Sequence, residues 1–202
     1  MLRNQLRPAL VMTLLLMVIT GVVYPSAVTA VAHVFFPVQA GGSLVTRDDG
    51  SVVGSALIGQ QFTTANYFHS RPSAAGSGYV GDSSNATNKG PTDRKLADTL
   101  IAQAVDSAVA NEGAVKGQIP SDMVTSSASG LDPDISPANA ELQVARVARA
   151  RNAAPDRIRA IVTAHTQGRQ FGFFGEPRVN VLRLNLALDS ALSVPVAPPS
   201  AH

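Results

Sequence analysis

The residues best suited to chemistry in this chain are a polar stretch and the histidines that could serve it. The stretch "TSSASGLDPDISP", residues 125–137, carries the hydroxyl and carboxylate groups from which hydrolytic sites are built. Such a site also needs a base, and His33 and His202 lie in an apolar segment and at the end of the chain. An exported hydrolase would therefore have to use His69 or His165. No G-x-S-x-G motif occurs, so we expect no catalytic residues and keep the hydrolase as an alternative.

Metal and phosphate chemistry have equally little support. The chain has no cysteine and no H-x-x-x-H pair, and Asp132 and Asp134 supply only two of the six or more oxygen ligands that calcium takes. The segment "KGPTD", residues 89–93, lacks the spacing of a phosphate-binding loop. We expect no metal site and no tightly bound cofactor.

The stretch 125–137 has a structural interpretation as a stiff elbow. Asp132 and Ser136 each precede a proline, which restricts both to extended backbone, and Ser136 can cap a following helix. A stiff surface elbow is suited to holding a partner protein. The residues that we expect to face a partner are those of the elbow and one side of the helix that follows it: Asp132, Asp134, Ser136, Asn139, Gln143 and Arg146.

Helical spacing of apolar residues predicts three helices, over residues 92–113, 136–151 and 155–168. Residues 51–62 and 178–189 are typical of strands, and the Gly/Ser/Asn-rich residues 67–91 predict a long surface loop. The pattern indicates a small α+β domain. The predicted core face of the second helix is Ala140, Val144, Val147 and Ala148.

The N-terminal part of the chain predicts one membrane-spanning helix. Residues 9–36 are apolar, and about 20 such residues cross a bilayer. Pro25 is expected to kink or end the helix near the outer boundary. Arg3 and Arg7 precede the span, and the next charged residue is Arg47. Because cations are retained on the cytoplasmic side, the N-terminus should lie inside and the soluble domain outside the bacterial inner (cytoplasmic) membrane.

This reading divides the chain into five parts. They are a cytoplasmic N-terminus (1–8), the transmembrane helix with its interfacial extension (9–36), a junction (37–50), the extracytoplasmic domain (51–190) and a disordered tail (191–202). The alternative for the apolar segment is a signal peptide cleaved at the A-x-A site that ends at Ala32, which would release a periplasmic binding protein.

Charge argues against a nucleic-acid partner. Two of the 16 basic residues, Arg3 and Arg7, precede the apolar segment, and the other fourteen equal the 14 acidic residues in number. A domain that neutralises phosphates should carry a net basic excess. We therefore expect the lipid bilayer and other proteins as partners, and no nucleic acid.

Several motifs taken in order resemble the C subunit of the Kdp-type potassium-transporting ATPase, the KdpC family. The pieces are "RPALVMTLLLMVITGVVYP", "GSALIGQQF", "YFHSRPSA", "GPTDRKLA", "IPSDMVTSSASGLDPDISPANAELQVARVARAR" and "GEPRVNVLRLNLALD", which cover most of residues 7–189. The segment "GDSSNATNKGPT" departs from the glycine–serine-rich turn usual in the family.

The resemblance implies a non-catalytic accessory subunit. Its partners would be a channel-like potassium-selective subunit, a P-type subunit that hydrolyses ATP and a small membrane peptide. It also implies a catalytic chaperone that raises the pump subunit's affinity for ATP, with Gln143 at the position implicated in nucleotide contact. A domain outside the membrane cannot touch cytoplasmic ATP, so we expect any such effect to be transmitted through the complex.

Overall fold

The computed structural model describes residues 2–47 and 49–192 and divides into two compact units. The boundary lies between Ser55 and Ala56, where strand β2 ends, whereas the sequence suggested a boundary after residue 50. Each unit is described by itself.

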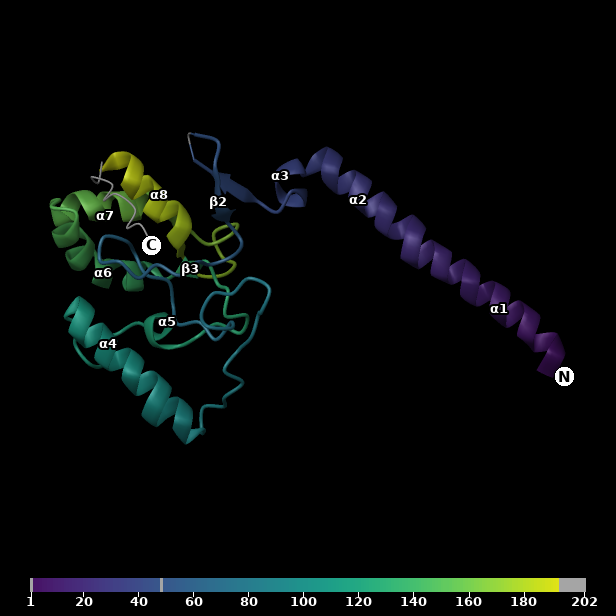
Figure 1. Ribbon diagram of the computed structural model, residues 1–202, viewed down its shortest axis with the longest axis horizontal. Helices are drawn as coiled ribbons and strands as arrows, with labels where there is room; N and C mark the ends of the chain where they lie inside the picture. Colours follow the sequence, from purple (N-terminus) through teal and green to yellow (C-terminus); the bar gives the residue numbers. More distant parts are fainter. Residues whose placement is uncertain (1, 48, 193–202) are drawn as a thin grey trace, which may run out of the picture. The chain divides into compact units, whose positions relative to one another are not determined.

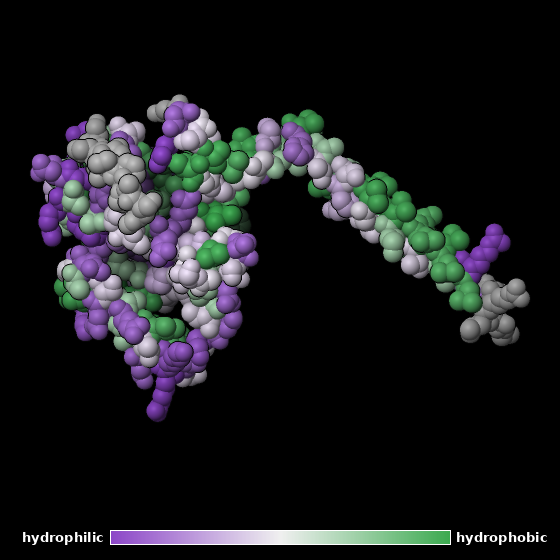
Figure 2. Space-filling model, viewed as in Figure 1, coloured by the Kyte–Doolittle hydropathy of each residue, from purple (hydrophilic) through white to green (hydrophobic). Residues whose placement is uncertain are grey.

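The first unit is dominated by one long helix (Figure 1). It comprises α1 (Leu2–Val18), the π-helical turn η1 (Ile19–Val23) and α2 (Tyr24–Phe35). Within it, Gln5–Phe35 contains an 18-residue window with a mean hydropathy of 2.1 and has no buried side chains, so it is long and apolar enough to cross a membrane. Figure 2 shows this apolar surface along the helix.

Pro25 does not end the helix, which continues to Phe35. A proline has no N–H and its ring crowds the carbonyl one turn earlier. The wide π-helical turn immediately before Tyr24 accommodates this position, since such turns occur where the regular hydrogen-bond ladder is interrupted. Thr20 Oγ1 donates to the carbonyl of Leu16 at 2.8 Å, which satisfies its hydroxyl within the helix.

After the short helix α3 (Pro37–Ala40), the first unit ends in a hairpin. Strand β1 (Leu44–Thr46) pairs antiparallel with β2 (Val52–Ser55), with an irregular register between Val45 and Thr46. The predicted strand at residues 51–62 therefore exists only in its first part. Its partner comes from the segment that the sequence identified as a junction.

The second unit contains helices and a small sheet. Its elements are η2 (Leu96–Ile101), α4 (Ala102–Glu112), α5 (Ser121–Val124), β3 (Asp134–Ile135), α6 (Pro137–Ala150), α7 (Pro155–Ala164), β4 (Thr166–Gln167), β5 (Arg178–Asn180) and α8 (Val181–Ala191). The strands are antiparallel in the order β3-β5-β4. This arrangement confirms the expected fold class, one N-terminal apolar helix followed by a small α+β domain.

The core lies where α6, α7 and α8 meet the sheet. The predicted face of α6 is buried as expected, and Ile158 and Val162 of α7 join it. The start of α6 is also confirmed, because Ser136 Oγ accepts from the backbone N–H of Asn139 at 3.1 Å. The core cluster consists of Phe68, Ile135, Ala140, Val144, Val147, Ala148, Ile158, Val162, Val179, Val181, Leu184 and Leu188.

The predicted strand at residues 178–189 was wrong for most of its length. Strand β5 stops at Asn180, whose side-chain oxygen accepts from the N–H of Arg183 at 3.1 Å and so caps helix α8. The buried residues Val181, Leu184, Asn185 and Leu188 recur at helical spacing. The alternation of leucines at 184, 186 and 188 fitted a strand equally well by sequence alone.

The predicted surface loop at residues 67–91 was also partly wrong. It has no regular structure, yet Phe68 and Ala75 are fully buried. Gly130 explains part of this packing, because a Cβ on it would lie 2.7 Å from the backbone nitrogen of Ala75, and its φ is +67°. The absence of a side chain at Gly130 lets the loop pack directly against residues 125–137.

Three element ends differ from the sequence predictions. The helix predicted to start at residue 92 is capped by Asp93, since its Oδ1 accepts from the N–H of Leu96 at 3.1 Å. Helix α7 ends at Ala164, before the predicted stop at Gly168. In the predicted tail, Leu192 packs against the core, and residues 193–202 lie outside the described part of the chain.

Candidate functional site

The three residues of α6 that were expected to face a partner have buried side chains. Asn139, Gln143 and Arg146 are only 1%, 2% and 9% exposed. They do lie on one side of the helix, but the irregular segment 65–69 and helix α4 cover that side. The expectation of an exposed polar face was therefore wrong, and the cluster is an internal network.

Gln143 uses its whole amide inside the unit. Its Oε1 accepts from the backbone N–H of His69 at 2.7 Å and from Arg146 Nη2 at 2.7 Å. Its Nε2 donates to the carbonyl of His69 at 3.1 Å and to Asn139 Oδ1 at 2.8 Å. Because a primary amide offers two donors and two acceptor positions, no hydrogen-bonding capacity is left for a ligand.

Arg146 forms a buried ion pair with Glu112 of α4. Its Nε lies 2.8 Å and 3.0 Å from the two carboxylate oxygens, and the Glu112 side chain is 5% exposed. Nη1 donates to the carbonyls of Ala65 and Tyr67 at 2.7 Å and 2.8 Å. One guanidinium thus joins α4, α6 and the segment 65–69. Losing either charged partner would leave the other buried without compensation.

Asp122 of α5 completes the network at its other end. Its carboxylate accepts from the backbone N–H and the hydroxyl of Ser136, at 2.7 Å and 2.9 Å, and from Asn139 Nδ2 at 3.0 Å. Sequence reasoning missed both Asp122 and Glu112. Nothing local marks them, because their partners lie 14 to 34 positions away in the chain.

The carboxylates of the elbow are engaged within the second unit. Asp132 pairs with Arg71 at 2.9 Å, and Asp134 with Arg178 at 3.1 Å. Burial raises the pKa of Asp134 above its usual value, against the opposing effect of the bond from Asn180. The elbow is thus held by internal contacts, as its structural interpretation proposed. Ser129 shows the same behaviour, since its hydroxyl accepts from the N–H of Leu131 at 3.1 Å.

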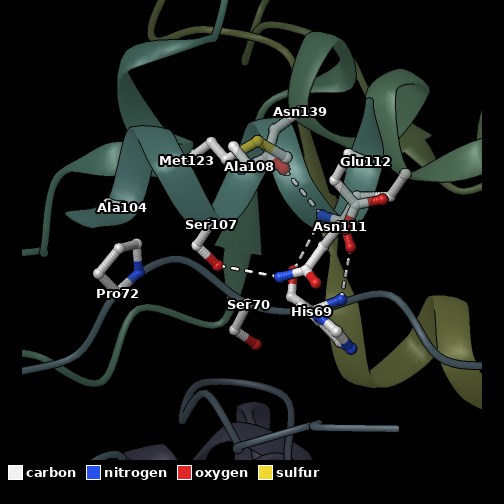
Figure 3. A pocket seen from close by; sticks show the side chains of 11 residues that line it. His69, Ser70, Pro72, Ala104, Ser107, Ala108, Asn111, Glu112, Met123 and Asn139 are labelled. Carbon is white, nitrogen blue, oxygen red and sulfur yellow. Dashed lines mark hydrogen bonds between the residues drawn. The ribbon is translucent and has the colours of Figure 1, made fainter. Parts of the chain in front are cut away.

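A hollow of about 210 Å³ opens beside the network (Figure 3). Helix α4 forms one wall and residues 69–72 another. In Figure 3 the side chains of Ser107 and Asn111 lie along α4, where Asn111 Nδ2 donates to Ser107 Oγ at 3.0 Å. The lining residues are His69, Ser70, Pro72, Ala104, Ser107, Ala108, Asn111, Glu112, Met123, Asn139 and Gln143.

The histidines do not have the geometry of a hydrolytic site. Nε2 of His69 lies 3.1 Å from the carbonyl of Thr64, and Nδ1 of His165 lies 3.0 Å from the carbonyl of Ile161. Burial, followed by the charge of Arg146, lowers the pKa of His69. Each ring is bonded to the main chain, whereas an activating base bonds a nucleophile. Among residues 2–47 and 49–192, no three acidic or histidine side chains converge as a metal site would require.

Fold and site together define a class of protein with one apolar anchor helix and a small α+β domain. In that domain, buried polar side chains bond the irregular segments and fix them in place. Residues 6–190 match the family model described as KdpC: K+-transporting ATPase, c chain. The chain belongs to the KdpC family.

Curated relatives agree over nearly the whole chain. The potassium-transporting ATPase KdpC subunit of Gemmatimonas aurantiaca is 62% identical over 188 residues, which cover 93% of each chain. The KdpC subunit of Koribacter versatilis is 51% identical over 96% of this chain and 98% of its own. That of Mycobacterium tuberculosis is 52% identical over 93% of this chain and 98% of its own.

Proposed function

We propose that this chain is an accessory subunit of a Kdp-type ATP-driven potassium uptake complex. Its partners there are a channel-like potassium-selective subunit, a P-type subunit that hydrolyses ATP and a small membrane peptide. Family membership over residues 6–190 and the single apolar helix support this assignment. Co-purification in mild detergent tests it. A chain that never brings the larger membrane subunits with it would contradict the proposal.

The soluble domain lies on the outer side of the inner membrane, over the mouth of the channel-like subunit. Arg3 and Arg7 before the apolar span support this orientation, because cations are retained on the cytoplasmic side. Cysteines engineered singly at residues 82–88 would test it, since the natural chain has none. We expect labelling in intact cells by a thiol reagent that does not cross the membrane. Labelling only after lysis would place the domain inside.

The chain raises the pump subunit's affinity for ATP without binding ATP itself. The observation that carries this proposal is the burial of Gln143, whose amide is fully bonded to His69, Asn139 and Arg146. A side chain held in this way cannot contact a nucleotide unless the network opens. We expect the effect on ATP to be transmitted as a coupling free energy between subunits. The pump subunit alone should then show a higher KM for ATP than the complete complex.

Crosslinking with a photoreactive ATP analogue distinguishes the direct from the indirect mechanism. We expect label on the pump subunit only. Label on this chain, competed by excess ATP, would show direct contact and overturn the indirect mechanism.

The anchor is retained and no binding protein is released. Ala32, the residue after which cleavage would occur, lies inside helix α2 and not in an extended segment. Mass spectrometry of the purified subunit should find the N-terminal segment intact. A mature chain that starts at His33 would favour the released protein instead.

A further inference from the structure

The loop between β4 and β5 exposes three phenylalanines. Phe171, Phe173 and Phe174 are 79%, 64% and 58% exposed, and all three fall within four consecutive residues. A folded domain seldom leaves several large apolar side chains together in water, and such patches mark interaction sites. The hollow at α4 does not explain them, because none of the three lines it.

The loop is held in one shape. Gln170 and Phe174 exchange two backbone hydrogen bonds of 2.9 Å. The ring centroids of Phe173 and Phe174 lie 4.2 Å apart. On either side of the phenylalanines in the chain, Arg169 and Glu176 form an ion pair at 2.7 Å. Phe171 itself has a φ of +53°, a conformation that costs free energy for any residue other than glycine. A loop that is ordered before it binds loses little entropy on docking.

The strand that follows the loop contacts the first residue of the second unit. The carbonyl of Ala56, the first residue of that unit, accepts from Asn180 Nδ2 at 2.9 Å at the end of β5. The phenylalanine loop leads into the other end of β5, a strand of only three residues. Strand β5, roughly 10 Å long at ~3.3 Å per residue, therefore separates the loop from this contact.

The charges around the loop favour a protein partner over a lipid surface. Arg169 and Arg178, the cations that flank it, are each paired with a carboxylate of the same unit. Binding to anionic lipid headgroups depends on clustered unpaired Lys and Arg, whereas aromatic anchors in a neutral surround are typical of protein interfaces.

We infer that Phe171, Phe173 and Phe174 dock into an apolar hollow on the outer face of the channel-like subunit. The inference rests on the proposed function, which supplies that subunit as the neighbour. The three rings would be the apolar centre of the contact, and the paired charges at residues 169, 176 and 178 its polar rim. The contact would fix the domain over the potassium entrance.

Serine substitutions in the full chain test the contact. Phe171→Ser together with Phe173→Ser should weaken association with the purified larger subunits by about tenfold or more, the range of aromatic hot spots. Val115→Ser is the matched control, because Val115 is 60% exposed on another part of the unit. Both variants should keep the unfolding temperature of the natural chain, since the altered side chains are exposed. Equal association of the double variant and the control would overturn the inference.

A fluorescent label separates the protein partner from the membrane. The single variant Phe173→Cys, labelled with an environment-sensitive dye before assembly, is compared in lipid nanodiscs with and without the larger subunits. A blue shift that requires those subunits supports the inference. A blue shift in lipid alone assigns the loop to the membrane, and no shift in either sample leaves it in water; both overturn the inference. If the natural chain itself fails to associate, the proposed function fails with it.

Discussion

Gln143 and Asn185, from two different helices, each bond both backbone groups of one residue in the same segment. Gln143 brackets the N–H and carbonyl of His69, and Asn185 does the same for Phe68, at 2.8 Å and 3.0 Å. Two side-chain amides therefore take the place of a neighbouring strand for a segment that has none. This explains how the backbone groups of these two residues are satisfied although no strand lies beside them.

Replacing Gln143 by alanine should destabilise the domain. The N–H of His69 and one nitrogen of Arg146 would lose their acceptor in a buried position, which costs about 1–3 kcal/mol for each unsatisfied group. Chemical unfolding of the full chain in detergent, followed by circular dichroism, measures the loss.

Asn185→Ala provides the matched comparison for Gln143. It removes the same kind of bracket from Phe68, on the side of the segment facing α8. We expect both variants to lower stability and to change the complex's KM for ATP by similar factors. A KM effect confined to Gln143→Ala at equal stability would instead favour a direct role of this glutamine toward nucleotide.

Glu112→Gln should be among the most damaging single substitutions. It leaves the guanidinium of Arg146 buried without an opposing charge, and breaking a buried pair in this way costs about 3–5 kcal/mol. Glu141→Gln is the control, since the Glu141–Arg159 pair is half exposed and surface pairs contribute about 0–1 kcal/mol. Thermal unfolding of both variants decides; similar losses in the two would contradict a structural role for the buried pair.

Stability should fall as the pH drops below the usual histidine range. The pKa of His69 is lowered from 6.5 by burial and by Arg146, so the unfolded chain binds a proton that the folded chain resists. Between those two pKa values the unfolded state holds more protons, and stability is therefore lost as the pH falls through 6.5. In His69→Gln this part of the pH dependence should disappear from unfolding curves recorded between pH 7.5 and 5.5. An unchanged slope would rule out His69 as its origin.

Alkaline conditions should reveal Tyr79. Burial raises its pKa to about 12, and its hydroxyl donates to the carbonyl of Arg71 at 2.7 Å. Because the unfolded chain loses this proton near pH 10, the contribution of the tyrosine is complete below that pH and is lost as the pH rises from 10 to about 12. Tyr79→Phe should remove this loss, at a cost of about 1 kcal/mol at neutral pH for the missing hydrogen bond.

Ultraviolet absorbance, which follows tyrosinate formation, checks the assignment of Tyr79. The natural chain has three tyrosines, and the transition near pH 12 should be missing from Tyr79→Phe. A transition near pH 12 that persists in the variant would refute the assignment.

Local chemistry let the sequence determine several features by itself. The single apolar span, predicted over residues 9–36, follows from length and hydropathy, and the start of α6 from a serine followed by a proline. The left-handed Gly113 ends α4 as its position predicted. These features depend on residues within a few positions of one another, and the family motifs are read along the chain in the same way.

Only the tertiary structure decided which polar residues lie inside. The spacing of Asn139, Gln143 and Arg146 placed them together on one side of α6, but a helix cannot show what covers that side. The cover comes from residues 65–69 and from Glu112, which are distant in the chain, so burial there depends on long-range packing. Long-range packing also explains why residues 181–191 form helix α8 and not the predicted strand. The spacing of the leucines fits a helix or a strand, and only the elements packed against this segment determine which face is buried.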